Sequence, residues 1–285
     1  MPERYRTTTV RLRRLAAELR RLRGEAGLSR EDVVGRTGVN VATLYRIEHA
    51  RVRPQTRTLR ALLDAYGVSE ARQAELQSLS REAGQRGWLQ AYQSELPEQY
   101  TTYIGFEDEA RSVWNYESLL LPGLLQTEDY ARAVIRGGLP DADHDDVERR
   151  VEARMARQPV LTRDNPVRLW AIVDEAALRR RVGGQAVMSA QLHRLIQAAE
   201  IPAITLQVIS FDAGAHPGMP GSFAIIKFPG DDDPDVVYID SMAGGLFVEE
   251  DAAIQRYALT FEHLRAVALS PANSLTLLAS IAEVT

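Results

Sequence analysis

The sequence contains no cysteine, and its 34 basic residues include a single lysine, Lys227. A chain without cysteine has no disulfide, no thiol nucleophile and no thiolate ligand for a metal. No uncharged apolar run reaches the ~18 residues that a transmembrane helix needs. The first residues lead into arginines rather than into the apolar core of a signal peptide. We therefore expect a cytoplasmic protein that has no membrane contact, no metal and no cofactor.

The sequence signatures of several enzyme classes are missing as well. There is no P-loop, no Gly-x-Gly-x-x-Gly before a helix and no Gly-x-Ser-x-Gly. His144, His193, His216 and His263 have no metal-ligand spacing between them, and the acidic run 231–235 lacks the alternating ligands of an EF-hand loop. We therefore expect that the protein is not an enzyme.

The charge that is present is distributed unevenly along the chain. Residues 1–90 hold 18 arginines and 10 acidic residues, a net charge of +8, whereas residues 91–285 hold 16 basic and 29 acidic residues, a net charge of −13. A basic head on an acidic body indicates that the head meets a polyanion. The preference for arginine over lysine is itself typical of GC-rich codon usage and carries no functional weight.

The basic head predicts five helices. Apolar residues recur at helical spacing over 11–23. Ser29 and Asn40 are good caps for two short helices that are separated by a turn at Gly38-Val39, and two further helices are expected over 56–66 and 69–84. Two short helices joined by a glycine turn and packed on a longer first helix form a helix-turn-helix.

Residues 19–68 resemble the Cro/C1-type (lambda-repressor-like, XRE) helix-turn-helix family. The resemblance is carried by Gly27-Leu28-Ser29, Gly38-Val39, Leu44, Arg46-Ile47-Glu48 and Pro54. The sequence departs from the family at His49-Ala50, where a glycine is usual, and we expect this difference to stiffen the exit of the third helix. The family pattern also pairs Glu48 with a basic residue at the end of the first helix, here Arg23. This implied ion pair predicts that a change of either residue harms folding before it harms specificity.

In this family the third helix lies in the major groove of DNA. On the matching positions Val41, Ala42 and Arg46 face the bases, with Thr43 and Tyr45 beside them. Arg46 can pair with guanine O6 and N7, and the two apolar side chains can touch a thymine methyl group. The alternatives are that Tyr45 packs on a neighbouring helix and that the arginines form only a solvated face. Contacts to the phosphates are expected from the helix starts and the segment that follows, at Ser29, Arg30, Asn40, Arg51 and Arg53.

Beyond the head, the pattern predicts a mixed α/β domain, so the fold class is α+β overall with an all-α five-helix head. Residues 106–121 have helical spacing. Strands are expected at Val167–Val173, Ile204–Ile209, Ser222–Phe228, Val236–Asp240 and Leu246–Glu249. Helices are expected over 127–136, 145–161, 184–200, 252–269 and 274–282. The resulting domain organisation is a tail over 1–10, a helix-turn-helix domain over 11–82, a connector over 83–105 with a hinge at Gly84–Gly87, and a regulatory domain over 106–285.

The body also resembles a known family, through the segments 103–135, 147–163, 169–184 and 204–240. It looks like the C-terminal domain, of unknown function, of an actinobacterial regulator family in which that domain follows a Cro/C1-type head. The resemblance implies transcriptional regulation in the cytoplasm, often beside a small acidic partner protein. It supplies no catalytic residues.

In the body, an aromatic and polar cluster is a candidate wall for a small-molecule pocket. Its members are Trp114, Tyr116, Gln126 and Tyr130, joined by His216 from a loop rich in glycine and proline. The alternative for the cluster is ordinary helix core, and for His216 it is a hydrogen-bonded loop residue. Asp174 is expected to cap a helix, although it could serve in acid–base chemistry.

These observations predict a sequence-specific, DNA-binding transcriptional regulator. Because one head reads one half-site, we expect a homodimer on a near-palindromic operator with half-sites ~34 Å apart. The body would sense a small molecule or a partner protein. A second interpretation is an antitoxin-like protein that binds a small acidic partner and autoregulates through its head. A third, an enzyme with a DNA-binding head, requires groups such as His216 and Asp174 to converge in one pocket.

Overall fold

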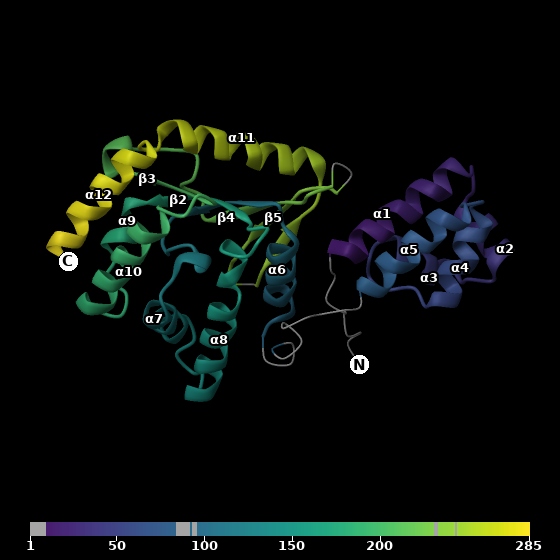
Figure 1. Cartoon of the computed structure of the whole chain (residues 1–285), viewed down its shortest axis with the longest axis horizontal. Helices are drawn as coiled ribbons and strands as arrows, with labels where there is room; N and C mark the ends of the chain where they lie inside the picture. The colour runs from purple at the N-terminus through teal and green to yellow at the C-terminus, as the bar shows by residue number, and fades with distance from the viewer. Residues whose placement is uncertain (1–9, 84–91, 93–95, 231–232, 243) are drawn as a thin grey trace. The chain divides into compact units, whose positions relative to one another are not determined.

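The structure is a computed structural model that describes residues 10–83, 92, 96–230, 233–242 and 244–285. The chain divides into two compact units, residues 1–91 and 92–285, and Figure 1 shows the elements of each. The hinge expected at Gly84–Gly87 and all but the last residue of the expected tail lie outside the described residues.

The N-terminal unit consists of the five expected helices, which are confirmed. Local signals position them. The Ser29 hydroxyl accepts a hydrogen bond from the backbone N–H of Asp32, and the Ser29 backbone N–H donates one to the Asp32 carboxylate, which together form a capping box. Gly38 adopts the left-handed conformation, with φ of 70°, at the end of the second helix, and Asn40 caps the third by accepting from the N–H of Ala42. The helices are α1 (Val10–Glu25), α2 (Arg30–Thr37), α3 (Val41–Glu48), α4 (Thr56–Ala65) and α5 (Glu70–Glu82).

Ala50 occupies the position where the resembled family has glycine. Its φ of 53° lies in the left-handed region, and among the described residues it is the only non-glycine residue with a positive φ. The left-handed conformation costs an L-residue roughly 1–2 kcal/mol. The Ala50 methyl group is buried in the helical core, and this burial offsets part of the strain by ~0.8 kcal/mol per buried carbon.

The C-terminal unit contains one six-stranded mixed sheet, with strand order β3-β2-β1-β4-β5-β6. Neighbours β1, β2 and β3 are parallel, while β4 is antiparallel to both β1 and β5, and β6 is antiparallel to β5. The carboxyl ends of β1, β2, β3 and β5 therefore lie at one edge of the sheet. The strands are β1 (Ser112–Glu117), β2 (Arg168–Asp174), β3 (Ile204–Ile209), β4 (Phe223–Lys227), β5 (Val236–Ile239) and β6 (Leu246–Val248).

Helices cover both faces of this sheet. Figure 1 shows α11 along one face and α6 and α8 on the other. Phe261 and Leu264 of α11 pack against Tyr116, Ile225 and other strand residues in a fully buried core. The α-helices described in this unit are α6 (Glu98–Glu109), α7 (Glu128–Gly138), α8 (His144–Ala156), α9 (Glu175–Arg179), α10 (Gln185–Ala198), α11 (Asp251–Val267) and α12 (Pro271–Val284). Short 3₁₀ turns described here are η2 (Gly123–Leu125), η3 (Gln158–Leu161) and η4 (Phe211–Ala213).

The five expected strands are confirmed, but the expected helix over 106–121 is wrong. Helix α6 ends at Glu109, and the segment that follows is β1, a central strand of the sheet. Helix α6 also begins at Glu98, within the expected connector, and belongs to the second unit. The region expected as one helix is thus the end of a helix, a turn and a buried strand.

No single helix in the described part of the chain is long and apolar enough to cross a membrane. Helices α11 and α12 reach the length and composition of a span only when taken together, and the chain bends by 68° at the break between them.

Candidate nucleic-acid interface

Large apolar side chains are exposed to solvent on α3 of the N-terminal unit. Among the described residues of that unit, the exposed large hydrophobic side chains are Val41, at 41% exposure, and Tyr45, at 37%. Both come from α3, whose buried residues are Leu44, Ile47 and Glu48. Together with Arg30, Asn40, Ala42 and Arg46 they line a shallow hollow.

Tyr45 lies at the centre of a basic and aromatic cluster. Its ring stacks on His49, one helical turn further along, at a centroid distance of 3.9 Å. The guanidinium carbons of Arg30 and Arg51 lie 5.4 and 5.6 Å from the ring centroid, within the range of cation–π attraction. Tyr45 is therefore held at the surface by its own helix and by two arginines.

The remaining predicted residues on this side of the unit also lie at the surface. Asn40, Ala42, Arg46 and Arg51 are exposed, and Thr43 is half-buried. Arg46 Nη2 donates to Thr43 Oγ1 at 3.4 Å. The starts of α2 and α3, at Ser29 and Asn40, carry the partial positive charge of helix N-termini.

Glu48 joins three helices beneath this surface. The side chain is fully buried, and its carboxylate accepts from Arg23 Nε of α1 at 2.5 Å and from Arg30 Nε of α2 at 2.8 Å. Arg20 donates to the Glu48 backbone carbonyl. Sequence reasoning placed Arg23 in this pair and assigned Arg30 to phosphate alone, but the structure binds Arg30 to the same carboxylate.

The five residues proposed to line a pocket in the body do not share one. Trp114 and Tyr116 face α11, where Trp114 stacks on Phe261 at 5.1 Å. Gln126 and Tyr130 are buried on the opposite side, where Gln126 Oε1 accepts from Arg154 of α8 at 2.9 Å. The sheet separates the two pairs.

His216 and Asp174 do meet, at the carboxyl edge of the sheet. His216 Nε2 lies 3.2 Å from Asp174 Oδ2, and the Tyr116 ring lies against His216 at 6.1 Å. Asp174 also caps α9 by accepting from the backbone N–H of Ala176 at 2.8 Å. No group of three or more His, Cys, Asp or Glu side chains with the geometry of a metal site occurs among the residues described.

Sequence reasoning missed a buried charged cluster under the sheet. Arg157 is 4% exposed, and its Nε lies 3.5 Å from Glu107 Oε1, on a carboxylate that is 1% exposed. The rings of Tyr100 and Tyr103 each lie 5.6 Å from the guanidinium carbon. Gly123 leaves the room that this guanidinium occupies, since a Cβ there would overlap it.

Glu117, the last residue of β1, has a carboxyl group with a raised pKa. Burial raises the pKa of its carboxyl from the usual 4.5 to about 7, and hydrogen bonds from Ser222 and Asn115 lower it only in part. The Asn115 Nδ2 to Glu117 Oε1 distance is 3.2 Å. The folded protein therefore holds this proton in a pH range where the unfolded chain has lost it.

This difference predicts a pH-dependent stability. Because the folded pKa is raised, the contribution is present below about pH 4.5 and is lost as the pH rises towards 7. One pKa unit is worth ~1.4 kcal/mol, so between pH 5 and 8 the wild-type protein should lose on the order of 2 kcal/mol relative to Glu117→Gln. Urea unfolding of the full chain at both pH values measures this. The exposed control Glu152→Gln should lose as much stability between pH 5 and pH 8 as the wild type. An equal change in the free energy of unfolding for the wild type and Glu117→Gln would contradict the prediction.

The fold and this surface together define a DNA-binding protein of the helix-turn-helix class. Residues 14–76 match the family model described as a helix-turn-helix domain. Residues 100–280, more than half of the chain, match the model described as a domain of unknown function, DUF5753. The chain therefore belongs to the DUF5753 family. The curated proteins and the solved structures contain no match to it.

Proposed function

We propose that the protein is a sequence-specific transcriptional regulator that acts in the cytoplasm as a homodimer. The observation that carries this proposal is the exposed surface of α3, where Val41 and Tyr45 stand uncovered beside Arg46. Isolated apolar side chains are common on protein surfaces. Here they fall on the helix that a helix-turn-helix places in the major groove, next to a basic side chain that can read guanine.

Each part of the surface then has a task on DNA. Val41 and Ala42 contact thymine methyl groups, and Arg46 pairs with a guanine edge. The N–H groups at the starts of α2 and α3 and the exposed Arg51 bind phosphates. Arg30 remains hydrogen-bonded to Glu48, and its guanidinium contacts the Tyr45 ring. It therefore contributes to phosphate binding mainly through its charge.

The C-terminal domain supplies the regulation in this proposal, by sensing a small molecule or a partner protein. An effector can change DNA affinity only if it binds two arrangements of the protein unequally. A protein partner, such as a small acidic protein, is favoured by the exposed apolar side chains on loops at the carboxyl edge of the sheet. These are Leu119 at 57% exposure, Phe211 at 58% and Met219 at 68%. A second candidate function is an antitoxin-like role, in which DNA binding serves autoregulation. The same exposed apolar side chains favour it.

Selection of binding sites from random duplex DNA by the full chain tests this function. We expect one enriched, near-palindromic sequence with half-site centres 10–10.5 base pairs apart, bound by two chains as measured by light scattering. Recovery of random sequences, or of a single half-site bound by one chain, would contradict a dimeric, sequence-specific regulator.

A further inference from the structure

The two lateral edges of the six-stranded sheet differ in how they are covered. At the β3 edge the Val208 N–H donates to Ser274 Oγ, and the Val208 carbonyl accepts from the Leu269 N–H, each at 2.9 Å. Helix α12 and the turn before it thus cover that strand, and Figure 1 shows α12 beside β3. At the opposite edge lies β6, whose outer side has no hydrogen-bonded neighbour in the described part of the chain. An open edge of this kind can pair with another extended chain.

The conformation of β6 is fixed by packing on its inner side. The Phe247 ring lies against Tyr238 of β5 and Phe106 of α6, at centroid distances of 5.1 and 5.4 Å. Gly245, just before the strand, lies so close to the Tyr238 ring that a Cβ there would overlap it. An edge that is already ordered loses little conformational freedom when a second strand pairs with it.

The surface next to the open edge combines an exposed apolar side chain with many acidic ones. Leu246, in β6 itself, is 56% exposed. Asp240, which follows β5, and Glu249 and Glu250, which follow β6, are exposed as well. Residues 231–251 hold eight acidic residues and no basic one. A chain that pairs with β6 therefore meets a negatively charged surface with a small apolar centre.

This charge decides which kind of chain fits the edge. Pairing of β6 with the β6 of a second copy would bring two acidic segments together, and like charges on paired strands are destabilising. A basic segment is attracted instead. Its arginine or lysine side chains reach Glu249 and Glu250, while a β-branched side chain, which favours strands, covers Leu246.

We propose that the open edge of β6 binds an extended, basic segment of a partner protein, which adds a strand to the sheet. Backbone hydrogen bonds to β6 supply affinity, and the acidic side chains select the charge of the partner. The site lies at the end of the sheet opposite to β3, the strand that leads into Phe211. Binding needs no DNA, and only the regulatory use of the contact rests on the proposed function.

A synthetic peptide tests the site in the full chain without DNA. The probe Arg-Thr-Val-Arg-Val-Thr-Arg combines arginines with β-branched residues, and fluorescence anisotropy of its labelled form at low ionic strength measures binding. The matched control carries N-methyl groups on its central Val-Arg-Val, which keeps the charge and removes N–H donors. We expect the control to bind about tenfold more weakly, because it loses backbone hydrogen bonds. Hydrogen exchange at the β6 amides should slow with the unmethylated probe only.

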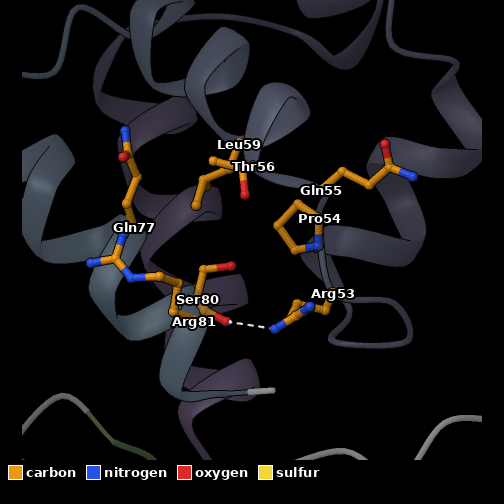
Figure 2. Close-up of a pocket in the computed structure, with 8 residues that line it drawn as sticks. All are labelled: Arg53, Pro54, Gln55, Thr56, Leu59, Gln77, Ser80 and Arg81. Carbon is orange, nitrogen blue, oxygen red and sulfur yellow. Dashed lines mark hydrogen bonds between the residues drawn. The ribbon is translucent and has the colours of Figure 1, made fainter. Parts of the chain in front are cut away.

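The N-terminal unit does not attract this probe. Residues 1–90 carry a net charge of +8, which repels a basic peptide. The hollow between the start of α4 and the end of α5, shown in Figure 2, is lined by Arg53 and Arg81 and by no acidic residue. Peptide binding by the full chain therefore reports on the C-terminal unit.

Variants of the chain test the charge and the edge separately. Glu249→Gln combined with Glu250→Gln should weaken probe binding about fivefold, since two exposed ion pairs are lost. The matched control, Glu152→Gln combined with Glu200→Gln, removes the same charge from exposed positions elsewhere and should change the affinity by less than twofold. Leu246→Lys places a positive charge beside the bound segment and should weaken binding about tenfold.

The outcomes decide for or against the proposal. Slower exchange of the β6 amides, together with weaker binding of the methylated peptide, supports it. Equal binding of both peptides with unchanged exchange would leave only a general attraction of charges and would overturn it, as would the absence of binding. A dimer seen by light scattering and lost in a folded Leu246→Lys protein would overturn it in favour of a second copy. Arg46→Ala should leave the peptide titration unchanged, so a failure of DNA recognition is seen separately.

Discussion

Replacement of Arg157 by methionine is expected to lower the free energy of unfolding of the C-terminal unit by ~3–5 kcal/mol, the usual cost of removing one partner of a buried ion pair. The substitution leaves Glu107, which is 1% exposed, without its cation. It also removes the cation–π contacts to Tyr100 and Tyr103. Fluorescence of Trp114 and Trp170 during urea unfolding of the full chain measures the loss.

The pH dependence of this loss has a definite sign. Burial already raises the pKa of Glu107, and removal of Arg157 raises it further, since the cation favours the charged form. A raised folded pKa means that stability falls as the pH rises, so Arg157→Met should be less damaging at pH 5 than at pH 8.

Two further variants separate the charge from the packing. Arg157→Met combined with Glu107→Gln should recover much of the stability, because no buried charge is left uncompensated. Arg163→Met, which removes an exposed pair with Asp108 at 3.0 Å, should cost less than ~1 kcal/mol. Equal losses for Arg157→Met and Arg163→Met would show that burial of the Arg157 pair has no energetic consequence.

Glu48→Ala should destabilise the N-terminal unit by about 3 kcal/mol. The carboxylate is fully buried and bonds both Arg23 and Arg30, so its loss disconnects α1, α2 and α3 at one point. The value lies at the lower end of the range for buried pairs, because these arginines are 19% and 33% exposed and can turn towards water. Amide hydrogen exchange in α1 and α4 of the full chain measures the change unit by unit.

The matched control for Glu48→Ala is Glu25→Ala. Glu25 pairs with Arg21 on the surface and is 57% exposed. Its replacement should therefore change the free energy of unfolding by no more than ~0.5 kcal/mol. At a temperature where Glu48→Ala remains folded, the ratio of affinities for selected and random DNA should match the wild type. A changed ratio with unchanged stability would mean that Glu48 acts on DNA recognition rather than on folding.

The helices of the head could be predicted because their signals are local. Ser29, Gly38 and Asn40 mark helix ends through their own side chains or backbone freedom. The apolar stripe of each helix follows the helical period. The outward-facing positions of α3 follow from the same period, so its exposed surface could also be predicted.

Strand β1 could not be predicted from periodicity, because it lies in the interior of the sheet with neighbours on both sides. Trp114 and Tyr116 face α11, while Asn115, on the other face, is 7% exposed and donates to the carbonyl of Phe223. A polar residue buried in this way breaks the apolar pattern of a central strand. The clustered Val113, Trp114 and Tyr116, which favour strands, were the one usable signal.

The buried ion pair of Arg157 depends on a contact between segments far apart in the sequence. Arg157 follows a helix that contains three half-buried arginines, Arg149, Arg150 and Arg154, and carries no local mark that distinguishes it from them. Glu107, its partner, lies 50 residues earlier. Such a group is recognised by its burial, which is known only from the three-dimensional structure.

The most direct test of the central claim compares two affinities of Arg46→Ala, one for the selected operator and one for random duplex DNA of the same length and at the same salt concentration. If α3 reads bases in the major groove, the variant loses ~1–3 kcal/mol on the operator, keeps nearly wild-type affinity for random DNA and tolerates any base at one operator position. Equal losses on both DNAs would place Arg46 on a phosphate and contradict the proposed reading of DNA by α3.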